Sequence, residues 1–209
     1  MPESSHIRRI AEHLISIDAP NPFAANTLAD YCRTIPGITE SVAGMDGITL
    51  QFDPLATSAP VLIEQLRELN IRRFGSSAQS TTELTLNVQF GADAGPDLEQ
   101  VARATGLQCE QIIDQLCHAS LTVAMIGFTP GFAYCTGLPE SLHTKRLSAP
   151  RPHSAAGSIA LGPGYCGIYA LAGPAGWPIV GRTEHVLFDA DIDNPLMLRP
   201  GMSLGLQPQ

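Results

Sequence analysis

The chain has 209 residues, of which 44% are hydrophobic, and a formal net charge of −8 from 12 basic and 20 acidic residues. This length and apolar content exclude a disordered chain and allow one large domain or two small ones, each with its own core. The acidic balance argues against a nucleic-acid surface, because phosphate binding needs a basic field, and favours small-molecule or protein partners.

At the N-terminus, the segment MPESSHIRRI lacks the apolar core of a signal peptide. Further along, no run approaches the roughly 18 consecutive apolar residues of a membrane span. We therefore expect a cytoplasmic protein that does not enter a membrane.

The first half of the chain alternates between strand and helix patterns. We expect a strand or short helix over Ile7–Asp18, a helix over Phe23–Thr34, strands over Ile38–Val42 and Gly47–Phe52, and a helix over Ala59–Leu69. The two strands are typical of a hairpin, because Asp46-Gly47 supplies the positive φ that tight hairpins need. These elements predict a small α+β domain.

The polar stretch Phe74–Glu83 has no apolar period and is typical of a linker, which places the domain boundary between residues 82 and 83. Beyond it we expect a strand, then a helix that Asp97 caps and Gly106 ends, then a second helix and a strand: Thr85–Phe90, Leu98–Thr105, Glu110–His118 and Leu121–Ile126. Short strands follow, predicting an all-β barrel or sandwich over residues 83–209: Ser158–Leu161, Gly167–Leu171, Ile179–Gly181 and His185–Phe188.

Neither the cysteines nor the histidines form a metal-binding pattern. The five cysteines show no CxxC spacing and are typical of small buried hydrophobes, and the six histidines have no HxH or i, i+4 pairing. We therefore expect no metal site. The chain also has no GxSxG, Walker or GxGxxG motif, so no catalytic residue is predicted from a motif.

The segment from Gly127 to Arg182 is the best candidate for a site, because it concentrates Gly and Pro among aromatic residues and arginines. Its stretch GFTPGFAY places Phe128, Phe132 and Tyr134 around a turn. Exposed amides of such a turn can hold a carboxylate or phosphate. The alternative is a tight turn capped by core aromatic rings.

Arginines in the same segment suggest an anionic ligand. Arg146 and Arg151 flank LSAP, Arg182 follows WPIVG, and guanidinium groups suit bidentate recognition of carboxylates or phosphates. The alternative is that each lies on a solvated face or in a surface ion pair. The nearest carboxylates, Asp97, Glu184 and Asp189, are typical of a helix cap and of surface charges.

Several ordered motifs resemble the KipI-like family, which includes the B-type component of 5-oxoprolinase, a sensor-kinase inhibitor of sporulating bacteria and the subunit-1-type half of allophanate hydrolase and urea carboxylase proteins. The matching stretches are FGADAGPDLEQVARATGL, TVAMIGFTPGFAY, PR at 150–151, AGS at 156–158, GIY at 167–169 and GW with IVGRT at 176–183. The resemblance is strong over Thr85–Gly205 and weak before it.

The resemblance implies a small N-terminal α+β domain and a C-terminal cyclophilin-like β-barrel. It implies a B-type subunit that acts with a KipA-like subunit and a LamB/YcsF-like subunit to open 5-oxoproline to glutamate with ATP. Within that expectation, the anion-binding residues are Arg146, Arg151 and Arg182, the loop that shapes the pocket has Gly131 and Phe132, and the apolar walls are Tyr169 and Trp177. A core role for Tyr169 and Trp177 is the alternative.

The sequence departs from the family pattern at positions expected in the cleft: Leu116, Lys145, Ala155, Tyr165, Cys166 and Ala175. Tyr and Cys in place of an amide and a hydroxyl change both volume and hydrogen bonding, so the substrate can differ. Two other functions stay open: a regulator that inhibits a sensor histidine kinase, and the carboxyltransferase component of a biotin-dependent, urea-carboxylase-like enzyme.

Overall fold

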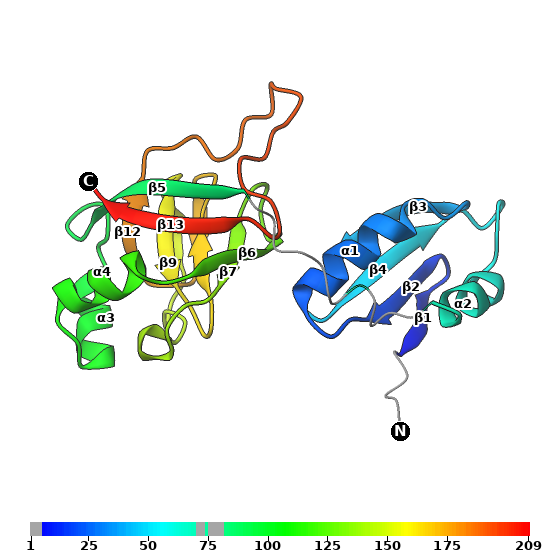
Figure 1. The fold of residues 1–209 in the computed structure, drawn as a ribbon, viewed down its shortest axis with the longest axis horizontal. Coiled ribbons are helices and arrows are strands. Elements are labelled where there is room, and N and C mark those ends of the chain that lie inside the picture. The colour runs from blue at the N-terminus through cyan, green and yellow to red at the C-terminus, as the bar shows by residue number, and fades with distance from the viewer. Residues whose placement is uncertain (1–5, 70–73, 75–81) are drawn as a thin grey trace. The chain divides into compact units, whose positions relative to one another are not determined.

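The computed structural model describes residues 6–69, 74 and 82–209, and the chain divides into two compact units, Met1–Ala78 and Gln79–Gln209 (Figure 1). The fold is α+β, with helices on a sheet in the first unit and a closed barrel in the second. The linker predicted over Phe74–Glu83 falls mostly outside the described residues. The boundary between residues 82 and 83 therefore stays a prediction.

The first unit is an antiparallel sheet of order β1-β2-β4-β3 with two helices packed on it. Its elements are β1 (Ile7–Ala11), β2 (Leu14–Asp18), α1 (Pro22–Cys32), β3 (Ile38–Ala43), β4 (Gly47–Phe52) and α2 (Ala59–Arg67). Both helices and the β3–β4 hairpin were predicted and are confirmed. The segment Ile7–Asp18, predicted as one element, is itself a hairpin of two strands.

On the two central strands, β2 and β4, every second residue is apolar and buried, and this alternation explains how the unit folds. Ile15 and Ile17 of β2 pair with Leu50 and Ile48 of β4, so that all four point to one face and are buried beneath the helices. The predicted reason for Gly47 is wrong, because its φ is not positive. A Cβ there would lie 2.4 Å from the Ile17 carbonyl oxygen, so a close strand approach requires the glycine.

The second unit is a closed barrel of seven strands in the order β10-β7-β6-β13-β5-β12-β9, with a separate two-stranded sheet of β8 and β11. The barrel strands are β5 (Glu83–Phe90), β6 (Leu121–Ile126), β7 (Ala133–Thr136), β9 (Ser158–Leu161), β10 (Cys166–Ile168), β12 (Ile179–Thr183) and β13 (Ser203–Pro208). The other elements are α3 (Leu98–Thr105), α4 (Cys109–Cys117), the 3-10 turn η2 (Glu140–Leu142), β8 (Arg151–Ser154) and β11 (Gly173–Ala175).

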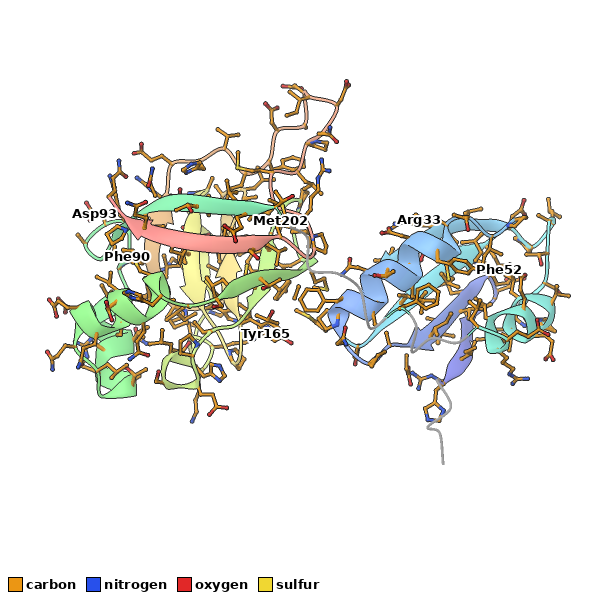
Figure 2. The ribbon with its side chains drawn as sticks, viewed as in Figure 1. Arg33, Phe52, Phe90, Asp93, Tyr165 and Met202 are labelled. Atoms are coloured by element: carbon orange, nitrogen blue, oxygen red, sulfur yellow. The ribbon has the colours of Figure 1, made fainter. Side chains whose placement is uncertain are left out.

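The last strand closes the barrel by pairing with two strands from early in the unit. β13 runs parallel to β5 and antiparallel to β6. Phe90 and Met202 lie at opposite ends of the β5–β13 pair (Figure 2). The helices α3 and α4 pack together against β12 and β13, on one side of the barrel (Figure 1). The strand predicted over His185–Phe188 is wrong, because only Phe188 pairs there, in an isolated bridge to Leu196.

The barrel interior is filled by alternating residues of its strands. Ala133 and Cys135 of β7 and Cys166 and Ile168 of β10 point inward into one large apolar core. The residues between them therefore point to the outer face. Among the described residues, no helix is long and apolar enough to cross a membrane.

Candidate functional site

A cluster of aromatic side chains lies on the outer face of β7, β9 and β10. We call this the aromatic cluster, and its rings are Phe132, Tyr134, Tyr165, Tyr169 and Trp177. The ring centroid of Phe132 lies 4.7 Å from those of both Tyr134 and Tyr169, in edge-to-face geometry. Trp177 lies 5.7 Å from Tyr134 and 6.2 Å from Phe132, which binds the cluster into one unit.

Small residues on the strands beneath make room for these rings. A Cβ on Gly167 of β10 would lie 2.8 Å from ring atoms of both Phe132 and Trp177, and a Cβ on Gly162 would lie 2.6 Å from the indole. The outward residue of β9 in the same cluster is Ala160. Glycine at these positions lets Phe132 and Trp177 lie directly on the strand backbone.

Arg146 places a positive charge on the cluster. Its guanidinium lies 5.8 Å from the centroid of the Trp177 ring, a cation–π distance. The Leu147 amide donates a hydrogen bond of 2.9 Å to the Gly176 carbonyl, which anchors the segment that carries Arg146 beside Trp177. Because Arg146 is exposed, its outer N–H groups are open to solvent.

These surroundings shift the pKa values of two hydroxyl groups in the cluster, those of Tyr134 and Tyr169. Burial raises the pKa of Tyr134 above its usual range, and the Arg146 guanidinium partly offsets the rise. Burial also raises the pKa of Tyr169, while the backbone of Gly176 and Trp177 and the charge of Arg146 oppose the rise. Both hydroxyls are therefore protonated near neutral pH and can donate hydrogen bonds.

Arg151, predicted to bind a ligand anion, is engaged within the fold. Its Nη2 donates to both carboxylate oxygens of Asp97, at 2.7 and 2.8 Å, and the Asp97 side chain is 8% exposed. Asp97 also accepts a 2.8 Å bond from the Ile179 amide. The predicted helix cap is therefore wrong: Asp97 stands at the start of α3, but its side chain makes no capping bond.

Arg182, the third predicted arginine, lies in strand β12. It pairs with Gln89 and Ser158 in the barrel wall, and its Cγ lies against Gly157. Each of the three predicted arginines thus has different neighbours. Arg146 is the one whose described contacts include the aromatic cluster.

The loop from Gly127 to Phe132 is the predicted Gly-rich turn. Three of its amides are used within the loop, since Gly127 donates to Phe132, Thr129 to Gly127 and Phe132 to Thr129. Gly131 has φ +74, and a Cβ there would lie 2.7 Å from the Ala170 Cβ. The loop is therefore a tight turn that delivers Phe132 to the cluster, which favours the second of the two interpretations of this stretch.

The departures from the family pattern separate into site and core positions. Tyr165 packs against Tyr134 with ring centroids 6.2 Å apart, and Ala175 is buried in the aromatic cluster. Cys166 and Leu116, by contrast, lie in the barrel core and not in a cleft. Burial raises the pKa of the Cys166 thiol to about 12, so the thiol stays protonated near neutral pH.

The two remaining departures from the family pattern are Lys145 and Ala155. Lys145 is exposed beside Arg146, and Ala155 is half-buried between β8 and β9. The sequence placed Tyr134 at the candidate turn and Tyr165 in the expected cleft, but it gave neither tyrosine a role in binding. The alternation of Ala133, Tyr134 and Cys135 is the signal that could have found Tyr134, because it places the tyrosine opposite the buried residues.

Comparison with other proteins identifies the family. The model of the carboxyltransferase domain, subdomains C and D, matches residues 7–198. A relative from Escherichia coli O157:H7, named as the B component of 5-oxoprolinase, is 36% identical over 182 residues, which are 87% of this chain and 83% of the relative.

Solved structures share the fold. The crystal structure of TTHA0988 superposes with a TM-score of 0.79 at 25% identity and covers 94% of this chain, which spans only 40% of that longer protein. The Kluyveromyces lactis urea carboxylase shares the fold alone, with a TM-score of 0.72 at 18% identity, over 100% of this chain and 22% of its own. On the matched domain and the identity to the 5-oxoprolinase B component, this chain belongs to the KipI-like family.

Proposed function

We propose that the chain is the B-type subunit of an ATP-dependent 5-oxoprolinase-like amidohydrolase, acting in the cytoplasm with a KipA-like and a LamB/YcsF-like subunit. The observation that carries this proposal is the 36% identity, over 87% of the chain, to a protein named as the B component of 5-oxoprolinase. In the reaction, water adds across the lactam C–N bond of 5-oxoproline, which gives glutamate while ATP is hydrolysed.

The aromatic cluster supports a role in holding the substrate. 5-Oxoproline carries one carboxylate on a small, mostly apolar ring. The exposed guanidinium of Arg146 is suited to the carboxylate, and the half-buried rings of Tyr134 and Tyr165 offer an apolar surface to the lactam ring. The neutral phenol of Tyr134 can donate to a carbonyl or carboxylate oxygen.

ATP fits the described residues of this chain less well than 5-oxoproline does. Of the three candidate arginines, Arg151 is held by Asp97 and Arg182 lies in the barrel wall, so the described contacts do not gather them around one polyphosphate. The amides of Gly127, Thr129 and Phe132 are also used within their loop. We therefore assign ATP to the assembled complex.

The test is ATP- and 5-oxoproline-dependent glutamate formation by the three co-purified subunits, with Arg146→Met compared with the wild type. We expect kcat/KM for 5-oxoproline to fall about 10–100-fold, the effect of losing one charge-assisted contact of roughly 1.5–3 kcal/mol. Arg103→Met is the matched control, because Arg103 is exposed on α3 and its described ion pair is with Glu99, at 3.7 Å.

The outcomes separate the site from the function. Glutamate formation that Arg146→Met leaves unchanged would remove Arg146 from the substrate site while the subunit assignment stands. A stable complex of the three wild-type subunits that forms no glutamate would refute the proposed function.

A second function, carboxyl transfer in a biotin-dependent enzyme, is favoured by two observations. The matched family model is described as a carboxyltransferase domain, and the fold recurs in a urea carboxylase. Transfer would need biotin supplied by another protein. Activity that avidin abolishes in the assembled complex would select this function over the hydrolase.

A further inference from the structure

Tyr134 is held in place by three neighbouring rings of the aromatic cluster. Its ring centroid lies 4.7 Å from that of Phe132, 5.7 Å from that of Trp177 and 6.2 Å from that of Tyr165, each time in edge-to-face geometry. Rings packed on several sides of a side chain restrict its rotamers. The Tyr134 ring therefore has a set orientation before any ligand binds.

Strand β7 turns this ring outward at a point where the neighbouring strand leaves room. Tyr134 alternates with two buried residues of β7, and its partner on β10 is Gly167. Because Gly167 has no side chain, Phe132 and Trp177 lie directly over β10, and both contact Tyr134. The position of the Tyr134 hydroxyl is thus set by the barrel sheet, which places a functional group more precisely than a loop does.

The hydroxyl at the end of this ring is not used within the described part of the fold. Tyr134 is half-buried, and no hydrogen bond joins its hydroxyl to another described residue. Tyr169, by contrast, is 3% exposed, and its hydroxyl lies against the backbone of Gly176 and Trp177. Of these two hydroxyls, that of Tyr134 is therefore the one that a ligand can reach.

The Arg146 guanidinium lies near the Tyr134 hydroxyl. It sits 5.8 Å from the centroid of the Trp177 ring, and Trp177 in turn contacts Tyr134. Burial raises the pKa of Tyr134, and the charge of Arg146 opposes this rise, as a nearby cation does. A small molecule bound here therefore meets a cation and a neutral hydroxyl donor.

These two groups differ in which oxygens of 5-oxoproline they suit. The carboxylate is charged at neutral pH and suits the guanidinium, whereas the lactam carbonyl is neutral and suits a neutral donor. When water adds to the lactam carbon, the carbonyl oxygen becomes negatively charged, and a donor already in place stabilises that charge without reorganisation. A hydrogen bond to this oxygen is therefore stronger in the transition state than in the bound substrate.

We propose that the Tyr134 hydroxyl is a catalytic group of the candidate site, donating a hydrogen bond to the lactam carbonyl oxygen of 5-oxoproline while Arg146 holds the carboxylate. This proposal rests on the proposed function, because it names a group that acts on the substrate of that reaction. The phenol keeps its proton throughout, and no covalent bond to Tyr134 forms or breaks. Tyr165, whose described ring contact is with Tyr134, supports that ring.

The test is Tyr134→Phe in the co-purified three-subunit complex, because this change removes the hydroxyl and keeps the ring. We expect kcat for glutamate formation to fall about 100–1,000-fold, the loss typical of one donor to an oxyanion. KM for 5-oxoproline should rise only about 2–10-fold, since a neutral hydrogen bond to bound substrate contributes much less. Tyr31→Phe is the matched control, because it removes the same group from a residue that is 41% exposed in the first unit.

Ligand binding provides a second readout that needs no turnover. Isothermal titration calorimetry of the same complex without ATP compares 5-oxoproline with cyclopentanecarboxylate, which keeps the carboxylate and the five-membered ring but has no lactam carbonyl. The wild type should bind 5-oxoproline more tightly, and Tyr134→Phe should reduce this preference about 2–10-fold. Tyr31→Phe should keep the full preference.

Each other outcome overturns the catalytic role of Tyr134. If Tyr134→Phe raises KM and leaves kcat unchanged, the hydroxyl binds the substrate without assisting the reaction. If Tyr134→Phe keeps the preference for 5-oxoproline, the carbonyl is bound elsewhere, and a lower Tm would show that the hydroxyl supports the fold. A wild-type complex that forms no glutamate refutes the proposed function, and the binding comparison then decides whether Tyr134 still recognises the carbonyl.

Discussion

At the scale of single residues, two arginines close in sequence have opposite environments. Arg146 is exposed and lies over the Trp177 ring, whereas Arg151 donates twice to a carboxylate that is almost fully buried. The same side chain is therefore available to a ligand at one position and committed to the fold at the other. Both arginines flank the short stretch LSAP, so the sequence alone does not show which of them is available to a ligand.

The Asp97–Arg151 pair should contribute to stability and not to substrate binding. Arg151→Met leaves the Asp97 carboxylate buried with only the Ile179 amide, so we expect a loss of about 2–4 kcal/mol in the free energy of unfolding. This lies at the low end for a broken buried pair, because the Arg151 side chain is 33% exposed. Urea unfolding measures the loss.

A double-mutant cycle checks the cause of that loss. Asp97→Asn combined with Arg151→Met should recover part of the stability, because no buried charge then lacks its partner. Losses that simply add would contradict a direct interaction. Arg103→Met, which breaks an exposed pair, should change the stability little.

At the scale of elements, the three-residue strand β10 contributes to the barrel core on one face and supports the aromatic cluster on the other. Cys166 and Ile168 fill the barrel core, while Gly167 between them lies under Phe132 and Trp177. The outer cluster depends on the missing side chain at Gly167. Periodicity predicts the strand, but only the pairing with β7 and β9 shows what covers each face.

Gly167→Ala should disturb the aromatic cluster directly. The new Cβ would lie 2.8 Å from Phe132 and Trp177 ring atoms, so the rings must move, at a cost of about 1–3 kcal/mol. Trp177 is the single tryptophan of the chain, so its intrinsic fluorescence reports on this site alone. We expect a red-shifted emission maximum and a lower Tm.

Gly173→Ala is the matched control, since a Cβ at Gly173 of β11 meets nothing within 4 Å. It should leave both the emission maximum and the Tm unchanged. Equal effects of the two substitutions would mean that the space beneath the rings does not decide the position of Trp177.

At the scale of the whole molecule, each unit has its own apolar core. The core of the first unit is built from β2, β4 and both helices, and that of the second from the barrel strands with α3 and α4. Separate cores are the condition for independent folding. The candidate site draws only on residues of the second unit.

A fragment of residues 82–209 should therefore fold alone. We expect a cooperative thermal transition by circular dichroism and the same Trp177 emission maximum as in the full chain, because the aromatic cluster lies entirely within the fragment. An emission maximum typical of a solvated indole would show that the barrel needs the first unit in order to form.

The local elements of this protein are encoded in short stretches of its sequence. Helices such as Leu98–Thr105, ended by Gly106 with φ +75, and the hairpin of β3 and β4 follow from apolar spacing and turn residues, which act over a few positions. The ordered motifs also determined the family. The strand predicted over His185–Phe188 was wrong, because only Phe188 pairs there, and it does so with the loop before β13.

Tertiary structure alone decided which of the candidate residues meet. Asp97 and Arg151 are 54 positions apart and Asp97 and Ile179 are 82 apart, and no local pattern encodes contacts over such separations. In the closed barrel β5 pairs with β12, which brings the start of α3 beside Ile179, where Asp97 also meets Arg151 of β8. That closure commits Arg151 to the fold and leaves Arg146 with the aromatic cluster, because a buried carboxylate needs a partner and an exposed cation does not.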